Sequence, residues 1–472
     1  MKIFGHYITR VTALFAALDA VLFLVLLQTL GIWHVCERCY LGSLLHLRPY
    51  QALLITAVFL LTTTSVGLYN TDATQDFRTF IKRFLLAWQL IFLPAVISIG
   101  VTKAAAGLPF GWYVGIMALA ISLFMLVLLS LRLVLVWGFG LKFLKKRLVV
   151  VGDGAMAQAV TDFLHGPGRS HFRCVETIRE WGPAPAVVTS IGNLKLKSPA
   201  AERAPLSALV EMLKAEEIVV AVEDRRGLPV AELLECKLKG VQVIDALTFW
   251  EREAGLIDPA SAGAGWLTFS GGFALDHRHR LFKRIADIVI SLLFLVAMAP
   301  LVLLVMLAIK LESPGPIFYR QERVGLNGQV FRVWKFRSMR QDAERDGVPR
   351  WANAVDDRVT RLGRFIRKVR IDEIPQVINV LAGDMSFIGP RPERPFFVEQ
   401  LKLQIPHYDL RHRVRPGITG WAQVNYPYGA SIEDARRKLS YDLYYLKKND
   451  LLLDFAILVQ TVRVILFAHG AR

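Results

Sequence analysis

The chain has 472 residues, of which 54% are hydrophobic, and a formal net charge of +17. This apolar composition excludes an ordinary soluble protein of the same length, and only four cysteines exclude a disulfide-stabilised scaffold. The positive charge suits a surface that faces anionic lipid head groups or phosphorylated substrates. It would also suit nucleic acid, but no nucleic-acid-binding motif is present, so nucleic acid is not expected as a partner.

Four apolar stretches in residues 1–145 predict an N-terminal four-helix transmembrane bundle. They run from Val11 to Trp33, Gln51 to Tyr69, Phe84 to Val101 and Trp112 to Trp137. Each is close to the ~20 residues that cross a bilayer core. The first stretch is too long for the hydrophobic region of a cleaved signal peptide, so we expect it to be retained. Lys and Arg are concentrated at the two ends of the bundle and between its second and third helices. Both ends are therefore predicted to be cytoplasmic.

Cys36 and Cys39 form a C-x-x-C pair in the loop after the first apolar stretch. A metal site would need more ligands, and only His34 is near. A disulfide is one interpretation, and it requires that this loop lie outside the cytoplasm. Two unpaired loop thiols are the alternative, and both interpretations stay open.

Residues 146–256 predict a Rossmann-like α/β domain. A short buried strand, Leu148 to Val151, precedes a glycine turn, and further strands are expected at Glu217 to Val222 and Val241 to Ile244. The helix Val230 to Leu238 separates the last two. Strands that alternate with helices indicate a small parallel sheet.

The turn after the first of these strands fits the G-x-G-x-x-G/A pattern of a dinucleotide site with Gly152, Gly154 and Ala157. Glu176 is a doubtful candidate for the ribose-binding acid, and Asp153 inside the turn would repel a phosphate. We therefore interpret the motif as a tight structural turn and keep a dinucleotide site as the alternative.

Residues 257–280 form a predicted linker rich in Gly, Ala and Ser, which leads into the segment 281–472. This segment begins with an apolar run from Ile285 to Ile309 that contains Pro300. Proline removes a backbone donor and clashes with the preceding turn, so the helix should be kinked there. The apolar tail from Leu451 to Ala468 predicts either an amphipathic helix at the membrane interface or a core helix.

The most informative residues are the adjacent carboxylates Asp372 and Glu373, which stand just before Pro375. Adjacent carboxylates repel each other, and a fold rarely gains stability from that repulsion. A divalent cation or a phosphoryl-transfer step explains the pair better, because Mg²⁺ takes one or two carboxylates together with substrate phosphates. An isolated pair of this kind would more simply be a solvated acidic helix end.

The pair is not isolated, because an ordered set of loop motifs surrounds it. These are Ser313-Pro314-Gly315-Pro316, Tyr319 to Gly325, Trp334 to Met339, Gly383 to Pro392, Arg415 to Val424 and Tyr441 to Leu446. The set resembles the bacterial sugar transferase family, the monotopic phosphoglycosyl transferases, over about residues 283–472. The preceding bundle and α/β domain resemble the long-chain members that act on undecaprenyl phosphate. The segments Asp224 to Gly227 and Thr248 to Glu253 resemble the exopolysaccharide subgroup.

This resemblance implies a transfer of sugar-1-phosphate from a UDP-sugar to undecaprenyl phosphate, with release of UMP. Asp372 would be the nucleophile that forms an aspartyl-phosphosugar, and Glu373 would hold Mg²⁺. Lys335 and Arg391 would clamp phosphates, and Asp442 would complete the polar site. Four further residues are predicted to bind substrate: Arg320, Arg337, Arg415 and Gly417.

The resemblance also implies that the helix 285–309 is re-entrant, with Pro300 as its kink. Many members carry Ser before this proline, whereas this chain has Ala299, so one stabilising hydrogen bond is in question and the kink is not. We expect a multi-pass protein of the bacterial inner membrane with its catalytic domain on the cytoplasmic face. Expected partners are the lipid bilayer, the later glycosyltransferases of polysaccharide synthesis and a second copy of the chain. A fifth spanning helix is the alternative, and it would place the catalytic segment outside.

Two other functions compete with this interpretation. The first is an NAD-dependent membrane oxidoreductase or sugar epimerase built on the glycine turn. It would require a clear ribose-binding acid and a Tyr-x-x-x-Lys pair in a helical site beside that turn. The second is a non-catalytic membrane organiser, which would not need the Asp372–Glu373 pair beside so many cationic residues.

Overall fold

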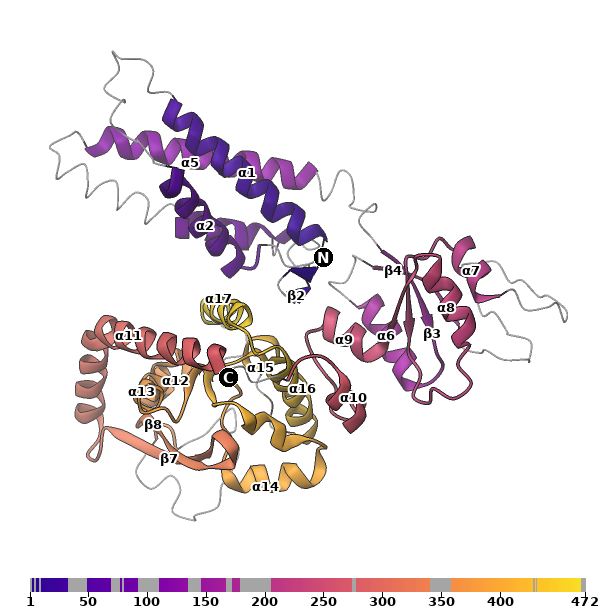
Figure 1. Cartoon of the computed structure of the whole chain (residues 1–472). Helices are drawn as coiled ribbons and strands as arrows, with labels where there is room; N and C mark the ends of the chain where they lie inside the picture. Colours follow the sequence, from indigo (N-terminus) through magenta and orange to yellow (C-terminus); the bar gives the residue numbers. More distant parts are fainter. Residues whose placement is uncertain are drawn as a thin grey trace. The chain divides into compact units, whose positions relative to one another are not determined.

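A computed structural model gives the fold of the chain, which separates into two compact units, Met1–Phe249 and Trp250–Arg472 (Figure 1). The structure describes residues 2–3, 6–7, 10–32, 49–68, 77–78, 80–91, 110–134, 146–166, 172–178, 205–273, 277–339, 358–427, 429 and 431–467. Cys36 and Cys39 lie outside the described residues.

The first unit begins with a two-stranded pair, β1 (Lys2–Ile3) and β2 (His6–Tyr7), followed by the apolar helices. These helices are α1 (Arg10–Ile32), α2 (Pro49–Ser65), the helical residues 80–91, and α5 (Phe110–Leu133). All four contribute to one aromatic core that includes Phe23, Phe59, Phe84 and Phe124. The Phe23 and Phe59 rings stack with their centroids 4.3 Å apart. The four predicted apolar stretches therefore pack against one another through large aromatic side chains.

One helix in the described part of the chain, His279–Glu312, is long and apolar enough to cross a membrane. Shorter apolar helical segments lie within α1, α2, α5 and the helix 451–467. They are Leu14–Val25, Thr56–Ser65, Ser122–Leu133 and Leu451–Val462. The predicted four transmembrane helices of the first unit thus stay a prediction.

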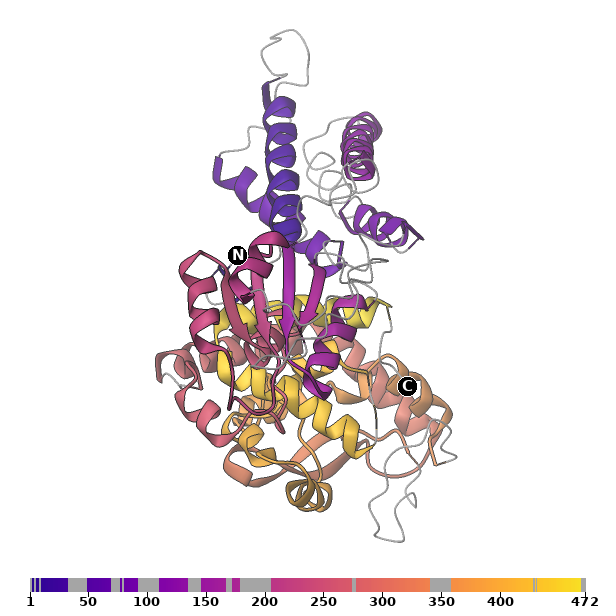
Figure 2. The same ribbon diagram turned by 90° about the vertical axis from the view of Figure 1, so that its right-hand side faces the viewer.

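A four-stranded parallel sheet follows in the order β4-β3-β5-β6 (Figure 2). Its strands are β3 (Lys146–Val151), β4 (Phe172–Ile178), β5 (Glu217–Val220) and β6 (Gln242–Asp245), and its helices are α6 (Ala155–His165), α7 (Leu206–Met212), α8 (Val230–Leu238) and α9 (Ala246–Glu253). Val149 and Ile218 pack against α7 and α8, and α6 lies on the other side of the sheet (Figure 1). Strands β3, β5 and β6 and helix α8 lie at their predicted positions. Strand β4 was not predicted, because its sequence mixes polar and apolar residues.

The glycine turn after β3 is explained by close packing. A side chain at Gly152 would place its Cβ 2.1 Å from the carbonyl oxygen of Ala221, which follows β5. Gly154 caps α6 at φ 92°, a conformation that glycine adopts without strain. Both glycines are thus required by the turn itself.

The second unit contains a β-hairpin, a short parallel strand pair and a set of helices. Its elements are α10 (Ala264–Phe269), α11 (His277–Glu312), β7 (Phe318–Val324), β8 (Val330–Phe336), α12 (Arg361–Lys368), α13 (Gln376–Ala382), β9 (Ser386–Ile388), α14 (Pro395–Gln404), β10 (Gly417–Thr419), α15 (Trp421–Asn425), α16 (Ile432–Lys448) and α17 (Leu451–Phe467). Helices α14, α16 and α17 share the main hydrophobic core, which includes Leu401, Leu443 and Ile457.

Residues 250–273, much of which the sequence predicts to be a linker, pack along α16. Ile257 is fully buried in the main core, and its N–H donates to the Ser440 carbonyl. Lys447 of α16 forms an ion pair with Glu251 at 2.6 Å, and the indole N–H of Trp421 donates to the Gly255 carbonyl. These residues therefore belong to the compact second unit.

Helix α11 turns sharply along its length and contains Pro300 (Figure 1). Its first arm is tied to the unit by Lys283, whose Nζ lies 2.6 Å from Asp454, and by Asp287, which accepts from the Ser386 hydroxyl at 3.0 Å. Its last turns bury Val305 and Ile309 against the same unit. A straight helix of these 36 residues would extend about 54 Å, so the bend is what allows both ends to dock.

Helix α17 packs one face into the core of the unit, and its placement at a membrane interface stays a prediction. Leu453 and Ile457 are buried in the main core, whereas Leu452 and Phe455 are exposed. Asp454 lies on the buried side, where it pairs with Lys283 and accepts from the Tyr445 hydroxyl. The tail thus combines a core-packing face with an apolar outer face.

Candidate active site

The adjacent carboxylates lie in a short 3₁₀ turn, Ile371–Glu373, between α12 and α13. Arg370 takes the left-handed conformation, with φ 60° and ψ 17°, and thereby reverses the chain after α12. Ile371 and Ile374 flank the carboxylates and pack on the apolar cluster that contains Ile309 of α11. The turn is therefore held by apolar contacts on both sides, and it presents Asp372 and Glu373 together.

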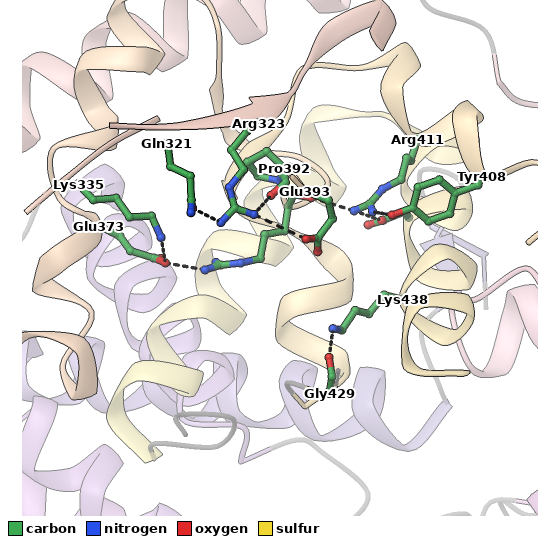
Figure 3. A network of polar contacts seen from close by, with 12 residues as sticks. Gln321, Arg323, Lys335, Glu373, Pro392, Glu393, Tyr408, Arg411, Gly429 and Lys438 are labelled. Atoms are coloured by element: carbon green, nitrogen blue, oxygen red, sulfur yellow. Dashed lines mark hydrogen bonds and ion pairs between the residues drawn. The ribbon is translucent and has the colours of Figure 1, made fainter. Parts of the chain in front are cut away.

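Three cations lie within 4 Å of Glu373, and Figure 3 shows one of them, Lys335, in contact with it. The Glu373 Oε1 lies 2.6 Å from the Arg391 guanidinium, 3.4 Å from Lys335 Nζ and 3.7 Å from the Arg370 guanidinium. Asp372 is also buried, and among the described residues its Oδ1 has no hydrogen-bond partner. The pair thus combines one carboxylate engaged by cations with one that keeps a free oxygen.

The pKa values of the two carboxyl groups are shifted in opposite directions. Burial alone would raise the pKa of Glu373, but the charges of Arg391 and Lys335 lower that pKa well below its ordinary value. Burial and repulsion by Glu373 raise the pKa of Asp372, and Lys335 and Arg370 oppose this only in part. Burial also lowers the pKa of Lys335. Two acids with separated pKa values are a common arrangement for different chemical roles.

The position of Lys335 follows from the β7–β8 hairpin and from Asn379. Asn379 of α13 accepts the Trp334 N–H at 2.9 Å and donates to the Arg332 carbonyl at 2.8 Å, which fastens β8 to α13. Lys335 follows Trp334, and its side chain reaches Glu373 in the turn that precedes α13. Asn379 is 2% exposed, and the sequence analysis did not identify it.

Asp442 does not contact the carboxylate pair. It is buried and forms an ion pair with Arg411 at 2.9 Å. Burial raises the pKa of Asp442 to about 6, against the effects of Arg411 and Lys438, while Glu393 adds to the rise. Its link to the site runs through Arg411, which donates to the Arg391 carbonyl at 2.9 Å.

The predicted substrate-binding residues have other contacts in this structure. Arg337 donates to the carbonyls of Ser313 and Pro314 at 2.7 and 2.8 Å and so closes the end of α11. Arg320 stacks on Trp334, with its Cζ 3.5 Å from the ring centroid. It pairs with Trp334 across the hairpin, so it lies on the face opposite Lys335.

The other two such residues help to pack the backbone. Arg415 donates to the Gly383 carbonyl at 2.9 Å, at the end of α13. A Cβ at Gly417 would lie 2.1 Å from the Gly389 nitrogen, because β9 and β10 approach closely. The predicted substrate contacts of these four residues stay predictions.

Sequence reasoning missed three arginines that shape the site: Arg323, Arg370 and Arg411. Arg370 was visible in the motif beside Asp372 but was given no role. The sequence did contain one signal for these residues, because the motifs around Asp372 and Glu373 hold more arginines than the two carboxylates can pair with. Sequence alone does not show which guanidinium faces which partner.

The two carboxylates could hold a divalent cation only together with substrate. Among the described residues no group of three His, Cys, Asp or Glu side chains could enclose a metal. Mg²⁺ needs only one or two carboxylates when substrate phosphates complete its shell. The unpartnered Asp372 Oδ1 beside Glu373 fits such a partial site, and the surrounding cations fit the remaining phosphate charge.

This geometry defines a class: a membrane-associated unit whose paired carboxylates and cations are suited to phosphoryl chemistry. The sequence pattern of the bacterial sugar transferase family matches residues 278–468. The chain belongs to this family.

Three relatives illustrate the match. A UDP-N-acetylgalactosamine-undecaprenyl-phosphate N-acetylgalactosaminephosphotransferase of Aeromonas hydrophila is 46% identical over 218 residues, 43% of this chain and 51% of that protein. A UDP-glucose:undecaprenyl-phosphate glucose-1-phosphate transferase of Escherichia coli (strain K12) is 44% identical over 186 residues, 39% of this chain and 40% of that protein. A putative undecaprenyl-phosphate N-acetylgalactosaminyl 1-phosphate transferase of Bacillus subtilis (strain 168) is 50% identical over 152 residues, 31% of this chain and 84% of that protein. The chain thus spans about half of the first relative, 40% of the second and 84% of the third.

Proposed function

We propose that the protein transfers a sugar-1-phosphate from a UDP-sugar to undecaprenyl phosphate and releases UMP, as the first membrane step of exopolysaccharide, capsule or O-antigen synthesis. The observation that carries this proposal is the Asp372–Glu373 pair. One carboxylate is ion-paired to three cations, and the other is buried with an oxygen that has no hydrogen-bond partner among the described residues. The names of the three relatives support the substrate classes. No observation favours an NAD-dependent reaction.

In the first half-reaction, the Asp372 carboxylate attacks the phosphorus that bears the sugar. The bond from this phosphorus to the bridging oxygen breaks, and UMP leaves with the electron pair. The product on the enzyme is an aspartyl-phosphosugar. Lys335 and Arg391 lie beside the carboxylates with side chains 20% and 29% exposed, so each can contact a phosphate while it is held by Glu373.

In the second half-reaction, an oxygen of undecaprenyl phosphate attacks the same phosphorus. The bond between phosphorus and the Asp372 oxygen breaks, which restores the carboxylate and gives undecaprenyl-diphospho-sugar. The apolar contacts of Ile371 and Ile374 connect this turn to the last turns of α11. Asp372 therefore lies close to the helix that meets the lipid.

Glu373, with the adjacent Asp372 oxygen, would hold Mg²⁺. A bound Mg²⁺ supplies charge that offsets the negative diphosphate. Arg391, Lys335 and Arg370 keep Glu373 ionised, because each places a positive charge within 4 Å of its Oε1.

We further propose that α11 is re-entrant and that the second unit lies on the cytoplasmic face of the bacterial inner membrane. Three observations support re-entry: Pro300 lies within the helix, both arms dock on the same unit, and the helix between them is apolar and exposed. The exposed residues include Leu292, Leu293, Val296, Leu303, Leu304 and Leu307. In lipid, the carbonyl freed by Pro300 needs a neighbouring partner.

The wider arrangement is also a proposal. The four apolar helices of the first unit form a transmembrane bundle, and the parallel sheet forms a Rossmann-like domain with a structural glycine turn. A multi-pass homodimer would deliver its product to later glycosyltransferases. The shared aromatic core and the sheet order support the first two statements.

The test uses membranes that contain the full chain. Each of a panel of UDP-sugars, labelled with ³²P in the sugar-bearing phosphate, is supplied without undecaprenyl phosphate. We expect a burst of UMP and label bound to the protein, which added undecaprenyl phosphate then removes. UMP release that strictly requires the acceptor, with no label on the protein, would contradict the covalent mechanism. No UMP release with any UDP-sugar would contradict the function.

A further inference from the structure

The loop that carries Arg391 is held by its carbonyl groups. Four consecutive carbonyls, from Pro390 to Glu393, each accept a hydrogen bond, and the donors come from three other segments of the unit. Gly417 N–H donates to Pro390 at 3.0 Å, and Val324 N–H donates to Glu393 at 2.9 Å. The two middle carbonyls accept from side chains, those of Arg411 and Arg323.

Arg411 is committed to this role. Its NH2 donates to the Arg391 carbonyl at 2.9 Å and lies 2.9 Å from Asp442, and its NH1 donates to the Tyr408 hydroxyl at 2.7 Å. The Arg411 side chain is 7% exposed, against 29% for Arg391. Arg391 is therefore open to a substrate, and Arg411 lies behind it.

Arg323 holds the next carbonyl from the other side. It donates to Pro392 at 3.0 Å and to the Gln321 side chain at 2.6 Å, and it lies 3.7 Å from Glu393 (Figure 3). Pro390 and Pro392 have no N–H groups, so the loop has few donors of its own. Its carbonyls must be satisfied by other segments.

We propose that Arg411 and Arg323 are positioning residues, which hold the loop 390–393 so that the Arg391 guanidinium stays on Glu373. Asp442 and Tyr408 orient Arg411, and they therefore affect the position of Arg391 only through Arg411. This assigns to Asp442 a task different from direct contact with substrate. This inference rests on the proposed function in those experiments that measure activity, and it does not rest on it in the hydrogen-exchange experiment.

The main experiment compares UMP release by the full chain and by Arg411→Gln. We expect kcat to fall about 10- to 100-fold, because a small displacement of a catalytic group has effects of this size. KM for the UDP-sugar should change little. Arg411→Lys keeps the charge beside Asp442 and should recover part of the rate. Arg332→Gln is the matched control, since Arg332 is exposed on the hairpin and pairs with Glu322.

A double-mutant cycle separates positioning from an independent role. If Arg411 acts through Arg391, then Arg411→Gln should slow an Arg391→Gln enzyme by no more than about twofold. If the fold-reductions in kcat caused by the two substitutions multiply in the double variant, the inference is overturned. Arg323→Gln, at a more exposed site, repeats the cycle if Arg411→Gln fails to fold.

Hydrogen exchange gives a readout that does not depend on activity. In Arg411→Gln, peptides that cover residues 389–394 should exchange faster than in the wild type, whereas those of α13 should not change. Unchanged exchange in this loop would overturn the positioning role even if the rate falls. A wild-type protein that releases no UMP would contradict the proposed function alone, and the exchange result would still decide this inference.

Discussion

Replacement of Asp372 by Asn separates catalysis from stability at one position. The amide is nearly isosteric with the carboxylate but is not a competent nucleophile. We expect UMP release to fall at least ~10³-fold, which corresponds to about 4 kcal/mol in the activation barrier.

The same substitution should leave folding intact or improve it. Burial and repulsion by Glu373 raise the pKa of Asp372, so the ionised form is disfavoured in the folded state. A group with a raised pKa stabilises the fold at low pH and loses that contribution as pH rises through the folded pKa. Ionisation of Asp372 therefore costs folding free energy, and the neutral amide avoids this cost. An unpartnered buried polar group costs about 1–3 kcal/mol in general, and this cost applies to the carboxylate and to the amide alike.

The assay is UMP release from membranes, combined with the thermal midpoint of the purified protein in detergent. The control is Asp409→Asn, because Asp409 is 62% exposed and pairs with Lys402 on the surface. Its rate and midpoint should match those of the wild type. More than a few per cent of the wild-type rate in Asp372→Asn would refute the nucleophile assignment. A large drop in its midpoint would refute the account of the pKa.

Three further predictions concern the metal, the pH profile and the topology. Glu373→Gln should slow UMP release and raise the Mg²⁺ concentration needed for half-maximal rate, whereas activity that survives EDTA unchanged would contradict a metal role. The wild-type rate should fall as pH drops through about 6, because Asp442, with its pKa raised to about 6, takes up a proton and Arg411 loses its charged partner. In Asp442→Asn the rate should no longer fall in this pH range. If the rate of this variant falls with pH as in the wild type, the loss of rate belongs to Asp372 instead. Leu281→Cys and Glu312→Cys are made separately in a chain without native cysteines. An impermeant maleimide should label neither cysteine in intact cells, and it should label both in permeabilised cells. Labelling of position 312 alone in intact cells would show a spanning helix.

The sequence by itself determined the family, the apolar segments and the carboxylate pair. These features depend on local patterns: runs of apolar residues, a strand followed by glycines, and motifs in a fixed order. The kink was also readable, because Pro300 acts on its own helix whatever surrounds it. Strand β4 and the packing of residues 250–273 were not readable, since they depend on partners far along the chain.

Lys335 and Arg391 were expected at the site from the family resemblance, but only the tertiary structure decided what each arginine contacts. Arg320, Arg337, Arg391 and Arg411 are equivalent as sequence, and each could bind a phosphate. Hairpin register places Arg320 opposite Lys335, and the end of α11 takes up Arg337. Arg411 is buried behind the loop, and Arg391 alone of the four pairs with Glu373 in the described part of the chain. Ion pairs form between residues that the fold brings within a few ångströms, and that proximity is a property of the whole unit.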